Sequence, residues 1–303
     1  MKKQKLIAIT GPSASGKTRL AIELAKELDG EIISADSRQI YKELEIGSAK
    51  PTIEEREGIP HHLLDIVDLT QDYTVANFCD DAKATIKDIE SRGKIPIIAG
   101  GTGLYFRVLL QDFELPRVAP NPQLRSELEE KSSDELYKML SNLDLASAEK
   151  IHPNNKVKII RALEVCLTLG IPMSKAQGKK PHNENIIWCG LNAKDRDFLY
   201  ERINKRVDIM IESGLLNEAE NLFNKYPDNK ILLSTIGYQE FFSYFQNSAN
   251  LEDCIMLLKQ NTRRYAKRQI SWFNANKDMN WFDIQTQSLE EIKAAITEKF
   301  KTL

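Results

Sequence analysis

The chain has 303 residues, of which 42% are hydrophobic, and its formal net charge is −2. This length and apolar content exclude a disordered or fibrous chain and favour two domains, or one domain with a large insertion. The four cysteines form no CxxC pair, which argues against a zinc module and a disulfide framework. The first apolar stretch ends at Thr10. It is too short for a signal peptide or a membrane span, so we expect a cytoplasmic protein.

The first hundred residues alternate short β-branched runs with helical patterns, which is typical of a parallel sheet with crossover helices. We expect strands over residues 6–10, 31–35 and 95–99. Apolar residues recur at spacings of three and four between residues 20 and 28 and again over residues 75–92, and both patterns predict helices. We therefore assign residues 1–112 to the first part of an α/β core.

Strand signals disappear after residue 112, and prolines separate short helical patterns such as residues 156–169. We therefore expect a helical insertion over residues 113–184. One further strand over residues 185–191 is followed by helical patterns over residues 197–213, 216–225 and 251–276. The core should thus resume at residue 185 and continue to residue 303.

The segment after the first predicted strand fits the pattern GxxxxGK[ST] in full, with Gly11, Pro12, Ser13, Ala14, Ser15, Gly16, Lys17 and Thr18. Between a strand and a helix this pattern predicts a P-loop, in which backbone N–H groups and the helix N-terminus bind phosphate. The lysine supplies a cation, and the threonine hydroxyl can ligate Mg²⁺. A nucleotide such as ATP and a diphosphate fit equally well. The expected fold class is α/β, a P-loop NTPase-like parallel sheet with a helical insertion domain.

A P-loop enzyme normally has a second acidic residue at the end of a strand. The predicted strand over residues 95–99 runs into Gly-Gly-Thr-Gly, so Asp36 is the only carboxylate at a predicted strand end near the P-loop. Because the carboxyl ends of parallel strands meet at one edge of the sheet, Asp36 and Thr102 should converge on the bound phosphate. Asp36 could be a group around Mg²⁺, a general base or a helix N-cap.

Residues 254–277 contain six basic residues and no acid, a concentration that the net charge of the chain conceals. Lys259, Arg263 and Lys267 recur every four residues, and Tyr265 lies among them. One face of this predicted helix could therefore follow the phosphates of a nucleic acid. The alternative is a solvated face that pairs with acidic residues elsewhere in the chain.

The chain resembles the tRNA dimethylallyltransferases, also called tRNA isopentenyl transferases, over nearly its whole length. The resemblance rests on GPSASGKT (11–18), ISADSRQIY (33–41), IGSAKP (46–51), PHHLLDI (60–66), PIIAGGTGLY (96–105), IHPN with RALEV (151–154 and 161–165) and RRYAKRQISWF (263–273). These motifs are specific jointly, whereas the P-loop alone is not. Gln239 and Asn274 stand where family members commonly carry basic residues, which leaves the tRNA affinity open.

This resemblance implies transfer of a dimethylallyl group from dimethylallyl diphosphate to the N6 amine of the adenosine immediately 3′ of the anticodon in tRNA. It implies that residues 13–18 hold the diphosphate with Mg²⁺, and that Asp36, Thr18 and Arg206 are catalytic, with Asp36 as general base. The residues implied to face tRNA are Asp36, Ser37, Arg38, Gln39, Thr102, Arg125, Val157, Lys158, Ile159, Ile160 and Arg161. Arg263 and Lys267 of the basic segment join them.

The expected partners are thus the tRNA anticodon loop and dimethylallyl diphosphate, with no membrane and no second copy of the chain. The resemblance also implies that the helical insertion moves as a tRNA clamp. Other activities remain open at this point: prenylation of free adenine nucleotides, a P-loop small-molecule kinase, and a non-catalytic nucleic-acid-binding protein. The basic segment favours a polymeric acceptor, a kinase does not explain the insertion, and a non-catalytic protein leaves Asp36 without a role.

Overall fold

The computed structural model describes residues 5–111, 113–116, 118–178 and 185–302. The chain divides into two compact units. The first, here called the sheet unit, comprises Met1–Phe106 with Asn183–Leu303, and the second, the helical unit, comprises Arg107–His182. The boundaries predicted for the insertion fall at residues 112 and 184, which lie outside the described residues.

The sheet unit is built on a six-stranded parallel sheet with the strand order β3-β2-β4-β1-β5-β6. Its strands are β1 (Leu6–Thr10), β2 (Gly30–Ser34), β3 (His61–His62), β4 (Ile95–Ala99), β5 (Ile186–Asn192) and β6 (Asn280–Asp283). The predicted α/β fold class is therefore confirmed. The two edge strands, β3 and β6, were not predicted, because two and four residues are too few to display an alternating pattern.

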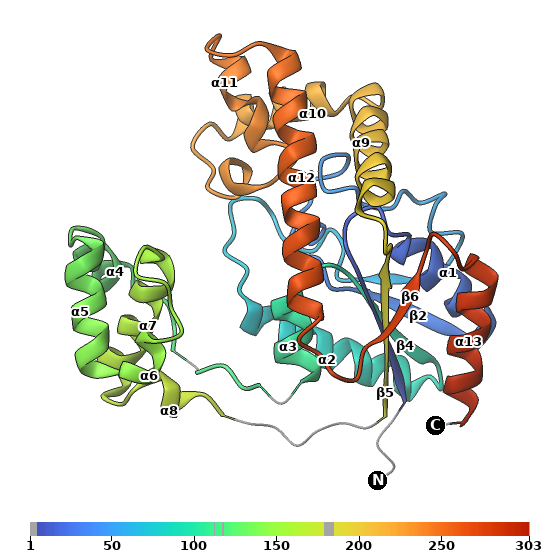
Figure 1. Ribbon diagram of the computed structural model, residues 1–303, viewed down its shortest axis with the longest axis horizontal. Helices are drawn as coiled ribbons and strands as arrows, with labels where there is room; N and C mark the ends of the chain where they lie inside the picture. The colour runs from blue at the N-terminus through green and yellow to red at the C-terminus, as the bar shows by residue number, and fades with distance from the viewer. Residues whose placement is uncertain (1–4, 112, 117, 179–184, 303) are drawn as a thin grey trace. The chain divides into compact units, whose positions relative to one another are not determined.

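Helices cover both faces of the sheet (Figure 1). The helices α1 (Lys17–Leu28) and α13 (Leu289–Thr302) pack on one face, whereas α2 (Val75–Ser91) and α3 (Gly103–Leu110) lie on the other. Since side chains alternate along a strand, Ile187 and Cys189 of β5 join the cluster under α1 and α13. Trp188 points to the opposite face, where its ring lies 6.0 Å from that of Phe106. The four cysteines are buried.

A group of helices extends beyond the carboxyl ends of the strands (Figure 1). It consists of α9 (Arg196–Glu212), α10 (Leu215–Lys225), α11 (Phe242–Phe245) and α12 (Leu251–Phe273), with the 3₁₀ turns η1 (Leu232–Ser234) and η2 (Gln239–Phe241). These elements share a buried core with the segment after β2, which contributes Ile40, Tyr41 and Leu44. This core places α9 and α12 over the carboxyl ends of the strands, where the P-loop lies.

The helical unit contains α4 (Pro122–Glu129), α5 (Ser133–Leu143), α6 (Leu145–Ala148), α7 (Lys156–Leu169) and α8 (Met173–Ala176). Asn121, Ser132 and Asn155 cap α4, α5 and α7 by accepting a backbone N–H with the side chain. The unit has a core of its own, in which Leu140 and Leu163 are fully buried. Among the described residues, no helix is both long and apolar enough to cross a membrane.

Candidate active site

The P-loop lies between β1, which ends at Thr10, and α1, which begins at Lys17. Gly11 has a φ of 145°, and a Cβ at this position would lie 2.4 Å from the carbonyl oxygen of Leu191 on the neighbouring strand. Only glycine fits this close approach. The N–H groups of the first turn of α1 have no acceptor within the helix, so the loop presents a helix N-terminus suited to an anion.

Lys17 places a cation within this loop. Its Nζ donates to the carbonyl oxygen of Pro12 at 2.7 Å. Burial of the ammonium and the positive charge of Arg206 together lower its pKa to about 7, although the negative charge of Asp36 opposes both effects. A bound anion would favour the protonated form of Lys17, so this lysine is poised to gain a proton when phosphate binds.

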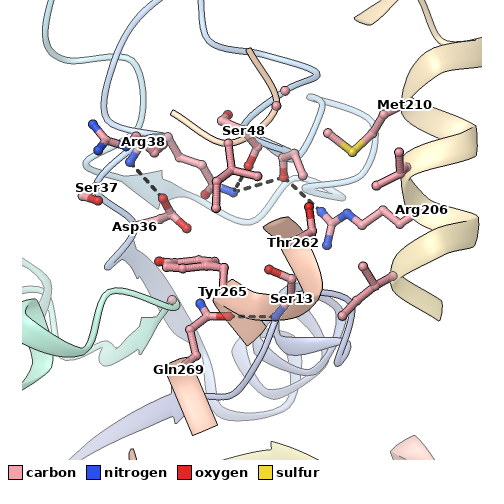
Figure 2. A pocket seen from close by; sticks show the side chains of 18 of the residues that line it. Ser13, Asp36, Ser37, Arg38, Ser48, Arg206, Met210, Thr262, Tyr265 and Gln269 are labelled. Atoms are coloured by element: carbon pink, nitrogen blue, oxygen red, sulfur yellow. Dashed lines mark hydrogen bonds between the residues drawn. The ribbon is translucent and has the colours of Figure 1, made fainter. Parts of the chain in front are cut away.

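A cleft of about 330 Å³ lies next to the P-loop, within the sheet unit. Residues from the P-loop, the segment after β2, α9 and α12 line it (Figure 2). The predicted site residues that line the cleft are Ser13, Lys17, Thr18, Asp36, Ser37, Arg38, Gln39 and Arg206. The other P-loop residues, Gly11, Pro12, Ala14, Ser15 and Gly16, are not among its lining residues and give the loop its shape.

Asp36 follows β2 and points into the cleft (Figure 2). Its Oδ1 accepts the backbone N–H of Arg38 at 2.9 Å. The N–H of Ser37 donates to Oγ1 of Thr102 at 3.0 Å, which links the segments that follow β2 and β4. Thr102 itself is not among the residues that line the cleft. Residues 37–40 form turns, so the possibility that Asp36 caps a helix is wrong. The carboxylate remains available as a base or as a group near a cation.

Arg206 enters the cleft from α9, which starts shortly after β5 at the same edge of the sheet. Its Nη2 donates to the carbonyl oxygen of Ala49 at 3.4 Å, and Nε2 of Gln39 donates to the same oxygen at 3.0 Å. Burial holds the pKa of Arg206 below its usual value, although the negative charges of Asp36 and Glu55 oppose this shift. Two cations, Arg206 and Lys17, therefore share one cleft with Asp36.

The cleft is also lined by residues that were not predicted from the sequence. Tyr265 and Gln269 come from α12, and Ile203, Val207, Met210 and Leu258 form an apolar part of the lining. Burial and the charge of Asp36 raise the pKa of Tyr265 to about 12. The spacing of four residues puts Tyr265 and Gln269 on one face of the helix, but no sequence pattern showed that this face borders the P-loop. The cleft thus combines an anion site with apolar surface.

The comparisons with known proteins agree with this geometry. The sequence profile of the IPP transferase family matches residues 39–276. A tRNA dimethylallyltransferase of Anoxybacillus flavithermus is 44% identical over 290 residues, which cover 95% of this chain and 93% of the relative. The chain belongs to the IPP transferase family. The family resemblance inferred from the motifs is thereby confirmed.

Solved structures of IPP transferases resemble this chain over nearly its whole length. The tRNA isopentenylpyrophosphate transferase of Bacillus halodurans is 40% identical with a TM-score of 0.75, covering 99% of this chain and 98% of that one. A eukaryotic dimethylallyltransferase acting on tRNA is 31% identical with a TM-score of 0.84, covering 98% of this chain and 77% of that one. The similarity therefore includes both units.

The basic face predicted on α12 of this IPP transferase is only partly exposed. Nη1 of Arg263 donates to Oδ1 of Asn204 at 2.6 Å, and Lys259 forms an ion pair of 2.5 Å with Asp208, so both residues pack against α9. Lys267, one turn further on, is exposed. The alternative interpretation, in which the basic face pairs with acidic residues elsewhere in the chain, therefore applies to Lys259. Lys267 remains a predicted tRNA contact.

The remaining predicted tRNA contacts lie in the helical unit. Nη2 of Arg125 lies 2.8 Å from Oε2 of the buried Glu164, and Nη1 of Arg161 lies 2.5 Å from the same oxygen. Of the other contacts predicted on α7, Val157 and Lys158 are exposed, whereas Ile159 and Ile160 are buried at 0% and 6% exposure. The prediction is wrong for these two side chains, because they lie on the face of α7 that packs into the core.

Proposed function

We propose that the chain transfers a dimethylallyl group from dimethylallyl diphosphate to the N6 amine of the adenosine immediately 3′ of the anticodon in tRNA. The observation that carries this proposal is the composition of the cleft: Asp36 shares it with the P-loop, Lys17, Arg206 and an apolar wall. The diphosphate of this donor matches the P-loop with its two cations, and the five-carbon dimethylallyl group matches the apolar wall. Membership of the IPP transferase family supports the same reaction.

The reaction breaks the bond between the allylic C1 and the diphosphate oxygen, and the bonding electrons leave with diphosphate. A new bond forms between C1 and N6 of adenine. The amine loses one proton in this step, and we assign Asp36 as its acceptor. The adenine amine is a weak nucleophile because its lone pair is delocalised into the ring, so a base that removes the proton as the bond forms contributes about 10²–10⁴-fold.

Negative charge grows on the diphosphate as the allylic bond breaks. Lys17, Arg206 and the first residues of α1 line the cleft in which we place this leaving group, and fixed positive groups stabilise a charge that develops in the transition state. The apolar side chains from α9 and α12 would exclude water from the allylic carbon, which has cationic character at this stage. We therefore expect the P-loop to bind the leaving group rather than ATP.

The residues present fit Mg²⁺. The cleft offers hard oxygen donors beside the P-loop, among them the hydroxyl of Thr18. Among the described residues, no group of three or more His, Cys, Asp or Glu side chains could hold a metal by itself. This suits Mg²⁺, which commonly uses one or two protein ligands together with substrate phosphates and waters. Mg²⁺ bound near Thr18 would neutralise part of the diphosphate charge.

The acceptor base must leave the stack of the anticodon loop to reach the cleft, since an enzyme cannot act on a base within a stack. Tyr265 offers an aromatic surface beside Asp36 (Figure 2). An adenine ring placed against this tyrosine would bring N6 towards the carboxylate.

The replacement Asp36→Asn tests the proposal. The amide has nearly the same shape but cannot accept the amine proton, so we expect transfer from labelled dimethylallyl diphosphate to fall by at least about 100-fold. Binding of tRNA should change by less than about threefold. A variant that turns over at the wild-type rate would exclude Asp36 as the base.

The acceptor is tested with wild-type protein, labelled donor, and either bulk tRNA or AMP, while ATP hydrolysis is followed in parallel. We expect label in tRNA alone and no ATP turnover. Label in AMP would instead support prenylation of free nucleotides, and ATP turnover without prenyl transfer would support a kinase.

A further inference from the structure

Gln269 of α12 connects two loops of the active site. The side chain is 5% exposed, and both of its amide atoms form hydrogen bonds with backbone. Its Oε1 accepts the N–H of Ser13 in the P-loop at 3.0 Å, and its Nε2 donates to the carbonyl oxygen of Gly101 at 3.0 Å. The P-loop, the turn after β4 and α12 are therefore held together by one side chain.

The turn after β4 is shaped to admit this contact. A Cβ at position 101 would lie 2.1 Å from Nε2 of Gln269, and a Cβ at Gly103 would lie 2.2 Å from Cδ1 of Trp272. Neither Gly101 nor Gly103 has a positive φ, so it is the close approach of α12 that requires glycine at both positions. Helix α12 thus packs directly on the backbone of this turn, and Gln269 lies at the contact.

The N–H of Ser13 has a different acceptor from the one that the motif suggested. It points to Gln269 (Figure 2), so it does not serve as a phosphate donor in this conformation. The anion site is then formed by the following amides at the start of α1, with Lys17. The positions of these amides depend on how Ser13, which precedes them in the loop, is held. Gln269 holds the backbone of Ser13.

We propose that Gln269 is a positioning residue that fixes the P-loop against α12 and thereby sets the affinity of the cleft for the donor diphosphate. Tyr265 lies one turn before it on the same helix and lines the same cleft. Gln269 consequently also fixes the P-loop relative to this ring. The identity of the donor is the one part of this inference that rests on the proposed function. The test of Gln269 uses inorganic diphosphate and does not depend on that identity.

The first experiment is titration calorimetry of inorganic diphosphate with Gln269→Asn. The shorter side chain keeps the amide but cannot span both partners, and loss of one such hydrogen bond corresponds to about a three- to tenfold weaker affinity. KM for dimethylallyl diphosphate should rise by the same factor, while kcat at saturating donor changes by less than about twofold. Gln260→Asn, at an exposed position of α12, is the matched control and should bind diphosphate as the wild type does.

Gly101→Ala is the second variant, and it leaves Gln269 itself in place. The added methyl group would displace Nε2 of Gln269, so we expect a similar loss of diphosphate affinity. Unchanged or tighter diphosphate binding in both variants would overturn the proposal, even if their melting temperatures fall, because a purely structural contact would lower stability alone. If diphosphate binding weakens as expected but the wild type transfers no prenyl group to tRNA, the positioning role stands and the proposed function fails.

Discussion

At the scale of single residues, Lys17 is the group whose protonation responds most directly to the ligand. Burial and Arg206 hold its pKa at about 7, far below that of an exposed lysine. The sequence identified Lys17 through its motif, because the P-loop is a local structure between a strand and a helix. The charges that surround it come from residues 36 and 206, which only the folded chain brings near it.

The pKa of Lys17 predicts a pH dependence of diphosphate binding. The bound anion favours protonated Lys17, so the pKa is higher in the complex than in the free protein. The contribution of Lys17 to the affinity should therefore be level below about pH 7 and fall by up to about tenfold per pH unit above it. Calorimetry with inorganic diphosphate between pH 6.5 and 8.5 measures this slope.

Lys17→Arg is the control for this pH dependence, because arginine stays charged throughout the range. The titration of diphosphate itself is common to both proteins and cancels in the ratio of their affinities. Parallel profiles for the wild type and the variant would contradict a depressed pKa for Lys17.

At the scale of elements, α12 shows what a helical pattern predicts and what it omits. Its periodicity predicted a helix over residues 251–276, and the structure has one over Leu251–Phe273. The pattern also identified the row of Lys259, Arg263 and Lys267. It did not reveal that the first two pack against α9, since this depends on a helix more than fifty residues earlier in the chain.

The different surroundings of these lysines predict different roles in tRNA binding. Lys267→Ala should weaken tRNA binding and lower the slope of log affinity against log salt by about one, because an exposed lysine can contact a phosphate. Lys259→Ala should leave the slope unchanged, since Asp208 already pairs with this lysine. Filter binding of tRNA at several salt concentrations measures both slopes.

Binding of inorganic diphosphate should be normal in both lysine variants, which separates tRNA contacts from effects on the donor site. Equal slopes for Lys267→Ala and Lys259→Ala would show that the ion pair with Asp208 does not decide which lysine is available.

At the scale of the whole molecule, the chain has separate hydrophobic cores in its two units. All residues that line the cleft belong to the sheet unit. The predicted tRNA contacts Arg125 and Arg161 lie in the helical unit, where the buried Glu164 binds both. Donor binding should therefore depend on the sheet unit alone, and acceptor binding on both units.

Leu163→Ala tests this separation. The side chain is fully buried in the helical unit, and its truncation should lower the free energy of unfolding of that unit by about 2–5 kcal/mol. The three tryptophans, at positions 188, 272 and 281, lie in the sheet unit. Circular dichroism at 222 nm should therefore begin its thermal transition below that of tryptophan fluorescence.

Diphosphate affinity of Leu163→Ala should equal that of the wild type below the first transition. Leu167→Ala, at a position of the same helix that is 46% exposed, should unfold as the wild type does. Loss of diphosphate binding in Leu163→Ala, or a single transition shared by both signals, would contradict independent cores.

The sequence by itself determined the features that depend on neighbouring residues. These are the P-loop, the four longer strands except for small shifts at their ends, the motifs that indicate the family, and the helices α1, α2, α7, α9, α10 and α12. The helix α13 was not predicted, although it is as long as α7. Residues close in the chain set these features through backbone conformation and side-chain periodicity. Asp36 could also be placed, because the carboxyl ends of parallel strands meet at one edge.

Only the tertiary structure decided which helix faces complete the site. Gln269 reaches Ser13 across 256 positions of the chain and Gly101 across 168. The packing of α12 fixes these contacts, as the packing of α7 buries Ile159 and Ile160. A helical pattern shows that an apolar or polar face exists, but its partner is chosen by the fit of side chains from distant segments, which the local sequence does not encode.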